Sequence, residues 1–576
     1  MQISRFVLAC LVIVFSTASY SLPVASAQTF DERLDSLMDQ DPPLPNIGEQ
    51  FVFPDELVPL WIKSLNRSEI ELRRLAADSI SLAHRYGAPG LQPTGEALMQ
   101  VLQQDAQPPV VLRAVARALV ELDERRAAAV LFRRSQAGAI EVAQVIEPAL
   151  AKWNFEPIRD VWLQRLENTA TRRTPLLLAI EGVGTTKEQR ATEPLLRIVE
   201  SVDQPRTVRL AAARSLGQIH TSGLTKTARE LVARKATIEH LLAAVLSAHH
   251  SDDEAIGLLQ QLATDVSPAV AAFALRRLFA IDPSLVFDLA EAATTNQDVN
   301  VRRVGAQALV AKADDAAIKL LRPLLDDPNP KLRRYVSQQL IELAANSPLR
   351  DTILAAATKT LSGDDWRGLE QSLIVLATLD HEPAMPRFVE LLTHRRTEVA
   401  VSAAWGLRRL AVTAALPAML RHAQSQSKQM SAETEPQLSH LFQAFGAMKY
   451  APAEPLLRSF APKSEQLIEA RAAAIWALGH LYQDQAPADL TKLFAKRLAD
   501  TVSIPPEDDR VRKMSAISIG RMRGEAALPT LREFSEGGTE PGLASGWAVE
   551  RITGEKPPPP VPTRRGFGEW FLMSIK

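Results

Sequence analysis

Apolar residues recur at helical spacing along most of this chain, and one pattern returns at a fixed interval. Residues 267–278, 298–309 and 329–340 each open on a polar or proline-containing turn and close on a leucine. The closing leucines, Leu278, Leu309 and Leu340, are equally spaced. A fixed period between about 20 and 50 residues is typical of proteins that stack one structural unit. The pattern therefore predicts a repeat protein.

The closing apolar position can be followed at similar intervals through nearly the whole sequence, and we call it the register position. It is occupied by Ile80, Leu119, Leu150, Ile180, Leu216, Leu246, Leu278, Leu309, Leu340, Leu376, Leu407, Phe445, Leu478, Ile519 and Val549. Before it, each unit contains an amphipathic stretch, a break rich in Asp, Asn and Pro, and a second stretch rich in alanine. We expect an all-α protein, an α-solenoid of about fifteen stacked helix pairs that share one core.

Residues 1–27 have the pattern of a secretory signal. Arg5 supplies the positive charge, residues 6–15 are apolar, and residues 25–27 read Ala-Ser-Ala before the predicted cleavage after Ala27. The apolar stretch is shorter than the roughly 20 residues that a membrane-spanning helix needs. The sequence therefore predicts a periplasmic or secreted protein without an integral membrane span once the signal is removed; an uncleaved anchor is the alternative.

Two proline-rich segments flank the predicted solenoid of residues 61–556. Residues 28–60 are interpreted as a linker that becomes ordered where Phe51, Phe53 and Trp61 cover the first repeat. Residues 557–576 join a stiff proline-rich spacer to an apolar tail that includes Trp570. We expect this tail to fold back over the last repeat, and a recognition peptide for another protein is the alternative.

The amino-acid composition limits the reactions and partners that we expect for the mature chain. Cys10, inside the predicted signal, is the single cysteine, so we expect no disulfide, thiolate nucleophile or cysteine-based zinc site in the mature chain. Lys and Arg number 66 against 67 Asp and Glu. Nucleic-acid-binding domains usually show a basic excess, so we expect no nucleic-acid partner.

An arginine lies seven positions before the register position in many units. The set is Arg73, Arg173, Arg209, Arg302, Arg333, Arg471 and Arg512. Residues i and i+7 share one helix face, so each arginine stem should lie along apolar surface with its guanidinium at the turn between repeats. We interpret the set as a structural ladder with nearby acids such as Asp298 and Asp508; a basic stripe for nucleic acid is the alternative.

Residues that could support catalysis or metal binding are few. His249 and His250 precede three acidic residues at 252–254, but neighbours on a turn rarely converge on one ion. His381 and Glu382 form a single His-Glu pair of possible metal ligands, without a second pair to complete a site. Residues 182–187 lack the spacing of a phosphate loop and follow a predicted helix. We therefore expect no metal site, no cofactor and no catalytic residues.

Three tryptophans hold equivalent places in their repeats. Trp405, Trp476 and Trp547 are equally spaced, and each lies two positions before a register position. Packing inside the array is one interpretation. The other is an aromatic row that anchors a partner, because tryptophan is enriched at binding hot spots. Together with Trp570 of the tail, they are the candidate partner-binding residues.

The repeats resemble HEAT repeats of the short bacterial type found in phycobiliprotein lyases. Residues 208–217, 470–479 and 511–520 carry the resemblance, which extends over most of residues 61–555. It implies a helical solenoid and says little about activity, because members bind proteins, nucleic acids or pigments and a few are enzymes.

We therefore expect an exported, non-catalytic scaffold that binds other proteins through the concave face of the array, lined by the second helices. The partner's identity is not encoded in these patterns. Two alternatives stay open: a HEAT-like enzyme of the pigment-lyase or DNA-glycosylase class, and a structural component of an envelope assembly.

Overall fold

A computed structural model describes residues 33–46, 50–54, 56–104, 107–137, 139–345, 348–428, 433–536, 538–557, 559 and 564–566. The predicted signal lies outside these residues, as do Phe567, Trp570 and the rest of the apolar tail. Within them, helices α2 to α31 form fifteen successive pairs, so the predicted all-α solenoid is confirmed. The described residues also include one short α-helix, α1 (Leu37–Gln40), two short strands, β1 (Gln50–Val52) and β2 (Arg564–Gly566), and several 3-10 turns within and between the pairs.

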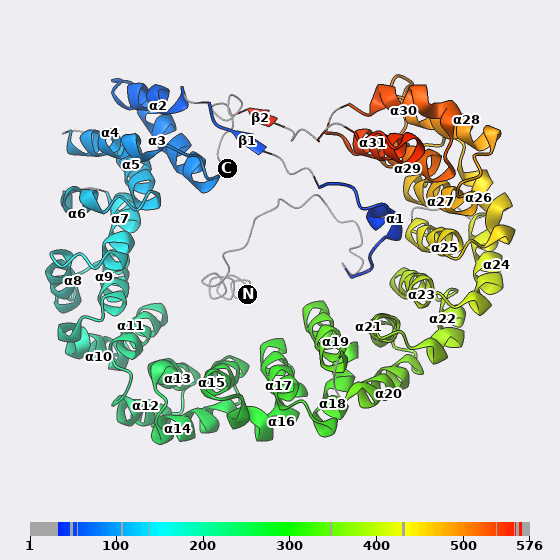
Figure 1. Ribbon diagram of the computed structural model, residues 1–576. Coiled ribbons are helices and arrows are strands. Elements are labelled where there is room, and N and C mark those ends of the chain that lie inside the picture. The colour runs from blue at the N-terminus through cyan, green and yellow to red at the C-terminus, as the bar shows by residue number, and fades with distance from the viewer. Residues whose placement is uncertain are drawn as a thin grey trace, which may run out of the picture.

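The first helix of each pair lies on the outside of a crescent and the second on the inside (Figure 1). The outer helices are α2 (Leu57–Leu65), α4 (Gln92–Gln103), α6 (Ala128–Ala137), α8 (Ile158–Glu167), α10 (Thr192–Glu200), α12 (Thr225–Ala233), α14 (Asp253–Ala263), α16 (Ala290–Thr294), α18 (Asp315–Leu321), α20 (Arg350–Leu361), α22 (Met385–Leu391), α24 (Leu416–Gln426), α26 (Glu454–Phe460), α28 (Ala488–Leu498) and α30 (Leu528–Phe534). The inner helices are α3 (Ile70–Arg85), α5 (Pro109–Glu121), α7 (Ile140–Lys152), α9 (Arg173–Thr185), α11 (Arg206–Ile219), α13 (Thr237–Leu246), α15 (Pro268–Ile281), α17 (Val299–Lys312), α19 (Pro330–Ala344), α21 (Trp366–Thr378), α23 (Thr397–Leu410), α25 (Glu435–Ala447), α27 (Ile468–Leu481), α29 (Asp509–Met522) and α31 (Glu540–Thr553).

Local chemistry explains where several inner helices begin. The Asn329 side chain accepts hydrogen bonds from the backbone N–H groups of Lys331 and Leu332, and Pro330 occupies the first helical position. Asp298 and Asp508 cap α17 and α29 in the same way. Such caps satisfy donors that have no partner inside the helix, and proline is tolerated there because its missing N–H would have had none.

All fifteen register positions lie in inner helices and are buried, with Val549 the most exposed at 6%. They belong to one apolar cluster that runs from Trp61 on α2 to Val549 on α31. Each pair therefore depends on its neighbours for burial, which is the expected physics of a stacked array.

The inner helices of the C-terminal repeats approach one another closely. A Cβ added at Gly446 on α25 would lie 2.6 Å from the Cα of Ala477 on α27. A Cβ added at Gly520 on α29 would lie 2.7 Å from the Cα of Ala548 on α31. Since the backbones meet where glycine stands, these helices form a tightly packed wall on the inside of the crescent.

Four of the seven arginines that precede the register position, Arg209, Arg302, Arg333 and Arg471, pair with an acid of the next repeat and form the ladder that the sequence predicts. Arg73 and Arg173 donate to Gln107 and Thr207 of the next repeat, and Arg512 pairs with Asp509 of its own helix and not with the expected Asp508. Arg209 pairs with Glu239 of the next repeat at 2.8 Å, and its Nε donates to the carbonyl of Val199 at the end of its own outer helix. Arg471 pairs with Glu507 at 2.9 Å and also donates to backbone carbonyls. The ladder thus joins successive repeats.

The sequence named the wrong acid for Arg302. We expected Asp298, but Asp298 caps α17, and Arg302 pairs with Asp327 of the next repeat at 2.7 Å. The correction follows from geometry, because a guanidinium at the turn between repeats reaches the following repeat more easily than its own helix cap.

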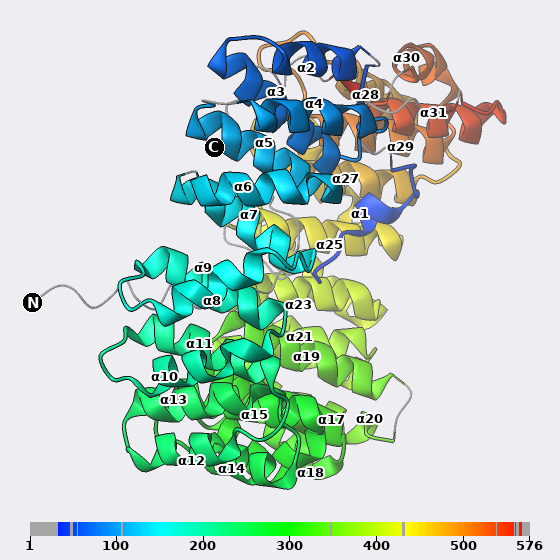
Figure 2. The ribbon, with the colours of Figure 1, turned by 90° about the vertical axis from the view of Figure 1, so that its left-hand side faces the viewer.

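The two ends of the crescent face each other, and Figures 1 and 2 show them on the same side of the molecule, away from α12 to α18. Strands β1 and β2 lie in the gap and pair in parallel, with Gln50 opposite Arg564 and Val52 opposite Gly566. The described parts of the N-terminal and C-terminal segments therefore meet at β1 and β2. The described part of the C-terminal segment crosses toward β1, while the apolar residues expected to cap α31 lie outside the described residues.

Candidate partner-binding surface

Residues 33–41 lie along the inside of the C-terminal half of the crescent; we call them the inner segment. In Figure 1, α1 of this segment is enclosed by the wall of inner helices beside α25. Side chains from six inner helices, α19 to α29, touch the segment or its charges. We call the following residues the docking surface: Ser337, Gln371, Trp405, Arg408, Gln443, Trp476, His480 and Arg521.

The segment begins at α19 and α21. Nη1 of Arg33 donates to the Ser337 hydroxyl at 2.9 Å, and Nη2 donates to Oε1 of Gln371 at 2.7 Å. The Ser337 hydroxyl donates to the same amide oxygen at 2.7 Å. Ser337 and Gln371 are fully buried, so Arg33 adds two hydrogen bonds to a polar pair that the repeats already hold in place at the inner face.

Asp35 meets α23. The Trp405 indole Nε1 donates to Oδ1 of Asp35 at 2.8 Å, and Nη2 of Arg408 donates to the Asp35 carbonyl and carboxylate at 2.7 and 2.8 Å. Burial alone would raise the pKa of Asp35, but the hydrogen bond from Trp405 and the charge of Arg408 hold that pKa below its usual value. Asp35 is therefore bound as a carboxylate.

The backbone of the segment is recognised by α25. Oε1 of Gln443 accepts from the N–H of Leu37 at 2.7 Å and from the Ser36 hydroxyl at 3.3 Å. Nε2 of Gln443 donates to the Ser439 hydroxyl at 3.0 Å, which fixes the orientation of the amide. Leu37 is the first residue of α1, so Gln443 satisfies a backbone donor that has no partner inside this short helix.

Asp41 meets α27 and α29. Nε1 of Trp476 donates to the Asp41 carbonyl at 2.8 Å, while His480 Nε2 and Arg521 Nη2 lie 3.0 and 2.9 Å from its carboxylate Oδ2. The hydrogen bond with His480, opposed by burial and helped by the charge of Arg521, lowers the pKa of Asp41. Burial lowers the pKa of His480, with Asp41 opposing. Carboxylate recognition thus occurs twice along the inner segment.

Apolar burial adds to these polar contacts. Met38 is fully buried, and Leu34 and Leu37 are partly buried against the common core. Full burial of a side chain of this size is worth about 1.5–3 kcal/mol. The inner segment therefore combines one apolar anchor with two acidic contacts.

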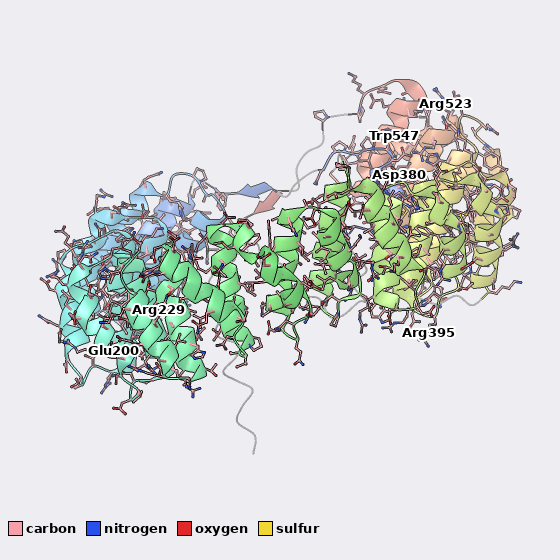
Figure 3. All side chains as sticks on the ribbon, turned by 90° about the horizontal axis from the view of Figure 1, so that it is seen from below. Glu200, Arg229, Asp380, Arg395, Arg523 and Trp547 are labelled. Atoms are coloured by element: carbon pink, nitrogen blue, oxygen red, sulfur yellow. The ribbon has the colours of Figure 1, made fainter. Side chains whose placement is uncertain are left out.

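The structure separates the four candidate tryptophans. Trp405 and Trp476 keep their rings buried, at 2% and 1% exposure, and direct their N–H groups to the inner segment. Trp547 is partly buried at the C-terminal end of the array, where its ring lies beside Gly520 (Figure 3). Trp570 lies outside the described residues. The rings of Trp405 and Trp476 therefore pack in the array, and their N–H groups contact a segment of the same chain, whereas partner binding by these residues stays a prediction.

Sequence reasoning missed Arg408, Gln443, His480 and Arg521. Gln443 stands two positions before the register position, as the tryptophans do, and Arg408 follows its register residue directly. His480 and Arg521 follow theirs by two. Polar residues that recur at fixed positions around the register residue on the inner helices could have indicated this surface. The spacing of the tryptophans did not reveal them.

The weaker candidates gain no support. His250 is buried, and its Nε2 accepts the N–H of Leu224 at 3.3 Å. Residues 182–185 belong to the end of α9. In the described ranges, no three His, Cys, Asp or Glu side chains are grouped to hold a metal ion. No described helix is long and apolar enough to cross a membrane.

Comparison with known proteins places the fold. A family model for HEAT repeats matches residues 256–342, from α14 to α19. A search of curated proteins finds no match. A chain from the structure of Kap95p with RanGDP is similar, with a TM-score of 0.52 and 11% identity over 86% of this chain and 72% of that one.

Two further solved chains align less closely. The Kap95:Nup1 complex gives a TM-score of 0.49 and 12% identity, over 86% of this chain and 72% of that one. Importin beta in ammonium sulfate gives a TM-score of 0.48 and 13% identity, over 87% of this chain and 72% of that one. The matched repeats and the shared fold support a HEAT-type helical-repeat protein.

Proposed function

We propose that this protein is a non-catalytic scaffold that binds extended segments of other proteins on its concave inner face. One observation carries the proposal: a stretch of chain already lies there, and five inner helices in succession, α19 to α27, donate to or accept from it. This stretch is extended on either side of the single helical turn of α1, and a surface that holds one such segment through main-chain and side-chain contacts has the chemistry to hold another.

We also propose that the chain is exported and belongs to the short bacterial type of HEAT protein. The n-region, apolar stretch and Ala-Ser-Ala site of residues 1–27 support export. The subtype is supported by the short repeats, since most register intervals lie below the roughly 40–47 residues usual for HEAT arrays. The similar Kap95p chain was solved with RanGDP, which agrees with protein binding by an array of this shape.

Site-specific photo-crosslinking in living cells tests the proposed function. A photoreactive residue at Gln307, partly exposed on inner helix α17, should trap specific protein partners. The matched control is the same residue at Arg229, exposed on outer helix α12 (Figure 3), which should trap none of them. Identical products at both positions would contradict binding through the concave face.

A further inference from the structure

We propose that the concave face recognises an extended acidic segment of a partner protein, and that the inner segment is a built-in occupant which such a partner displaces. This inference rests on the proposed function and specifies the partner's chemistry. It also extends the binding surface beyond the helices that touch residues 33–41.

The docking surface is built to donate hydrogen bonds. Its N–H donors belong to Trp405, Arg408, Trp476 and Arg521. The acceptors on the inner segment are the carboxylates and carbonyls of Asp35 and Asp41. Hydrogen bonds between charged groups are shorter and stronger than neutral ones. An acidic extended chain therefore fits this surface better than a basic one.

Burial is unequal on the two sides of the contact. The side chains of Arg408 and Arg521 are 2% and 8% exposed, whereas Asp35 and Asp41 remain 32% and 46% exposed. The cationic side is thus set inside the repeats, and the acidic side lies at the surface where water can compete for it. The cationic side is therefore a fixed part of the array, and the carboxylates of its present occupant are the groups that water or a competing carboxylate can reach.

The inner segment also leaves space beneath it. A depression of about 280 Å³, open to solvent, lies between Leu34 and Ser36 of the segment and Val401, Ser439 and His440 of the wall. Its lining also includes Glu435 and Glu469. A partner with a larger uncharged side chain at the place of Ser36 would fill more of this depression than the inner segment does, while its acidic residues meet Arg408 and Arg521.

The cationic character of the inner face continues past the inner segment. Arg214 on α11 and Arg276 on α15 stand two positions before the register position, the same place as Trp405 and Trp476. Arg303 on α17 stands six before it, the place of Lys513, whose Nζ lies 4.0 Å from Oδ1 of Asp39. Side chains two and six positions before the register position therefore face a chain that lies on the inner face.

These additional arginines are available for an acidic partner. Arg214 and Arg276 are exposed and Arg303 is partly exposed, and none of the three forms an ion pair with a carboxylate in the described part of the chain. At the N-terminal end, by contrast, Asp78 lies 2.7 Å from Arg74 and 3.8 Å from Arg117. The charge of Arg214 acts on Glu181 of α9 and opposes the rise that burial gives the pKa of Glu181, so Arg276 and Arg303 form the unneutralised row among the described residues, in the middle of the crescent.

The path of the inner segment gives the direction of the larger occupant. Its Arg33 end is at α19 and α21, and its Asp41 end is at α27 and α29. A longer chain in the same orientation would continue N-terminally over α17, α15 and α11. We therefore infer additional acidic residues on the N-terminal side of the part that replaces residues 33–41.

A polypeptide fits better than a nucleic acid. The surface accepts the backbone N–H of Leu37 and donates to the carbonyls of Asp35 and Asp41, which are peptide groups. The indole rings of Trp405 and Trp476 are buried and offer no stacking platform, which single-stranded nucleic acids use.

The test measures binding of two fluorescent peptides to the full chain by anisotropy. The short probe has the sequence of residues 28–46, and the long probe extends it at the N-terminus with five Glu-Ala repeats. D35N/D41N in the protein weakens the built-in occupant and should tighten binding of the short probe at least tenfold. In this variant the long probe should bind at least tenfold more tightly than the short one.

Further variants test the inferred path. R276Q/R303Q, added to D35N/D41N, should abolish the advantage of the long probe and leave the short probe unchanged, whereas R229Q on the outer helix α12 should change neither. Circular dichroism melting curves check that each variant is folded. Failure of both probes to bind, or an unchanged advantage in R276Q/R303Q, would overturn the inference.

Two outcomes separate this inference from the proposed function. If crosslinking from position 307 traps a protein while both acidic probes fail, the scaffold function stands and the acidic specificity falls. If a single-stranded oligonucleotide binds as tightly as the long probe and loses affinity in R276Q/R303Q, the surface is a polyanion site and the peptide proposal falls.

Discussion

At the residue scale, charges hold this protein together in two distinct ways. The ladder arginines join repeats from within, and Arg471 with Glu507 is the most buried example, each side chain being 2% exposed. Arg408 and Arg521 instead face the inner segment and bind its carboxylates. The arginine spacing predicted the ladder, because i and i+7 share a face. It could not predict the second set, whose partners lie near the opposite end of the sequence.

Replacing Arg471 by Ala should destabilise the array strongly. The change leaves the buried Glu507 with Arg497 as its remaining cation, at 3.2 Å, and removes four hydrogen bonds to the backbone or carboxylate at 3.1 Å or less. Breaking a buried ion pair costs about 3–5 kcal/mol. We expect a loss near the lower end of that range in the free energy of unfolding, measured by urea denaturation.

Arg173→Ala is the matched control, since Arg173 holds the same place in its repeat but is exposed and donates to Thr207. Its cost should be less than about 1 kcal/mol, the range of exposed polar pairs. Equal costs for Arg471→Ala and Arg173→Ala would refute the ladder as a buried structural device.

Acid should release the inner segment. Trp405, Arg408 and Arg409 lower the pKa of Asp35. His480 and Arg521 lower the pKa of Asp41. A carboxyl whose pKa is lower in the docked segment than in the free segment stabilises docking at any pH above the free value, which is about 3.9 for Asp. This contribution is lost as the pH falls from the free pKa through the docked pKa. Docking should therefore be strong at pH 6 and weaken below about pH 4.

A nitroxide on Cys at position 40, which is exposed on α1, reports the release as a change from a slow to a fast electron paramagnetic resonance spectrum. Circular dichroism at each pH checks that the helices persist. The D35N/D41N protein should show the fast spectrum throughout the range. A slow spectrum that stays unchanged from pH 6 to pH 3 in the unsubstituted segment would show that the carboxylates do not hold it.

At the element scale, the sequence was most informative where a pattern repeats. The register position identified every inner helix, because an apolar residue with small neighbours is needed wherever one helix pair covers the next. It did not identify the ordered path of residues 33–41. That path depends on contacts with distant repeats, whereas its own proline-rich composition indicates a linker.

Leu309→Asp should unfold the middle of the array. Leu309 is 2% exposed on α17, and an unpaired buried carboxylate costs several kcal/mol, here about 4 or more. Because neighbouring repeats share this core, we expect faster hydrogen exchange across residues 270–345, measured by mass spectrometry. Gln307→Asp, two positions earlier on the same helix and partly exposed, should leave the exchange nearly unchanged. Equal protection in both variants would refute the register.

At the scale of the whole molecule, the N-terminal and C-terminal segments link the ends of the crescent. The inner segment contacts the C-terminal repeats, β1 follows it and pairs with β2, and α2 then begins the N-terminal repeats (Figure 1). The sequence predicted that both flanking segments would become ordered on the array. It assigned each to its own end of the solenoid, and Phe53 does pack on the core beside Trp61 at the first repeat. The strand pairing, which also brings the two segments together, was not predicted.

Removing residues 557–576 should open the crescent. The deletion removes β2 and leaves β1 without its partner, so one of the links across the gap is lost. We expect a larger radius of gyration by small-angle X-ray scattering, with helical content unchanged by circular dichroism.

Deletion of residues 567–576 is the control, because it retains β2 and should leave the radius of gyration at the parental value. If that shorter deletion instead lowers the melting temperature and speeds proteolysis of residues 505–555, the apolar tail caps the last repeat as the sequence predicts. A longer deletion that scatters like the parent would show that strand pairing does not hold the ends together.

The account depends most on the docking of residues 33–41 against the inner wall in solution. A distance measurement between nitroxides at positions 40 and 485, after Cys10 is replaced by Ser, tests this directly by double electron–electron resonance. We expect one narrow distance distribution at neutral pH, which broadens when Asp35 and Asp41 are both replaced by Asn. A broad distribution in the protein that retains both aspartates would contradict the docked segment and, with it, the binding surface inferred from that segment.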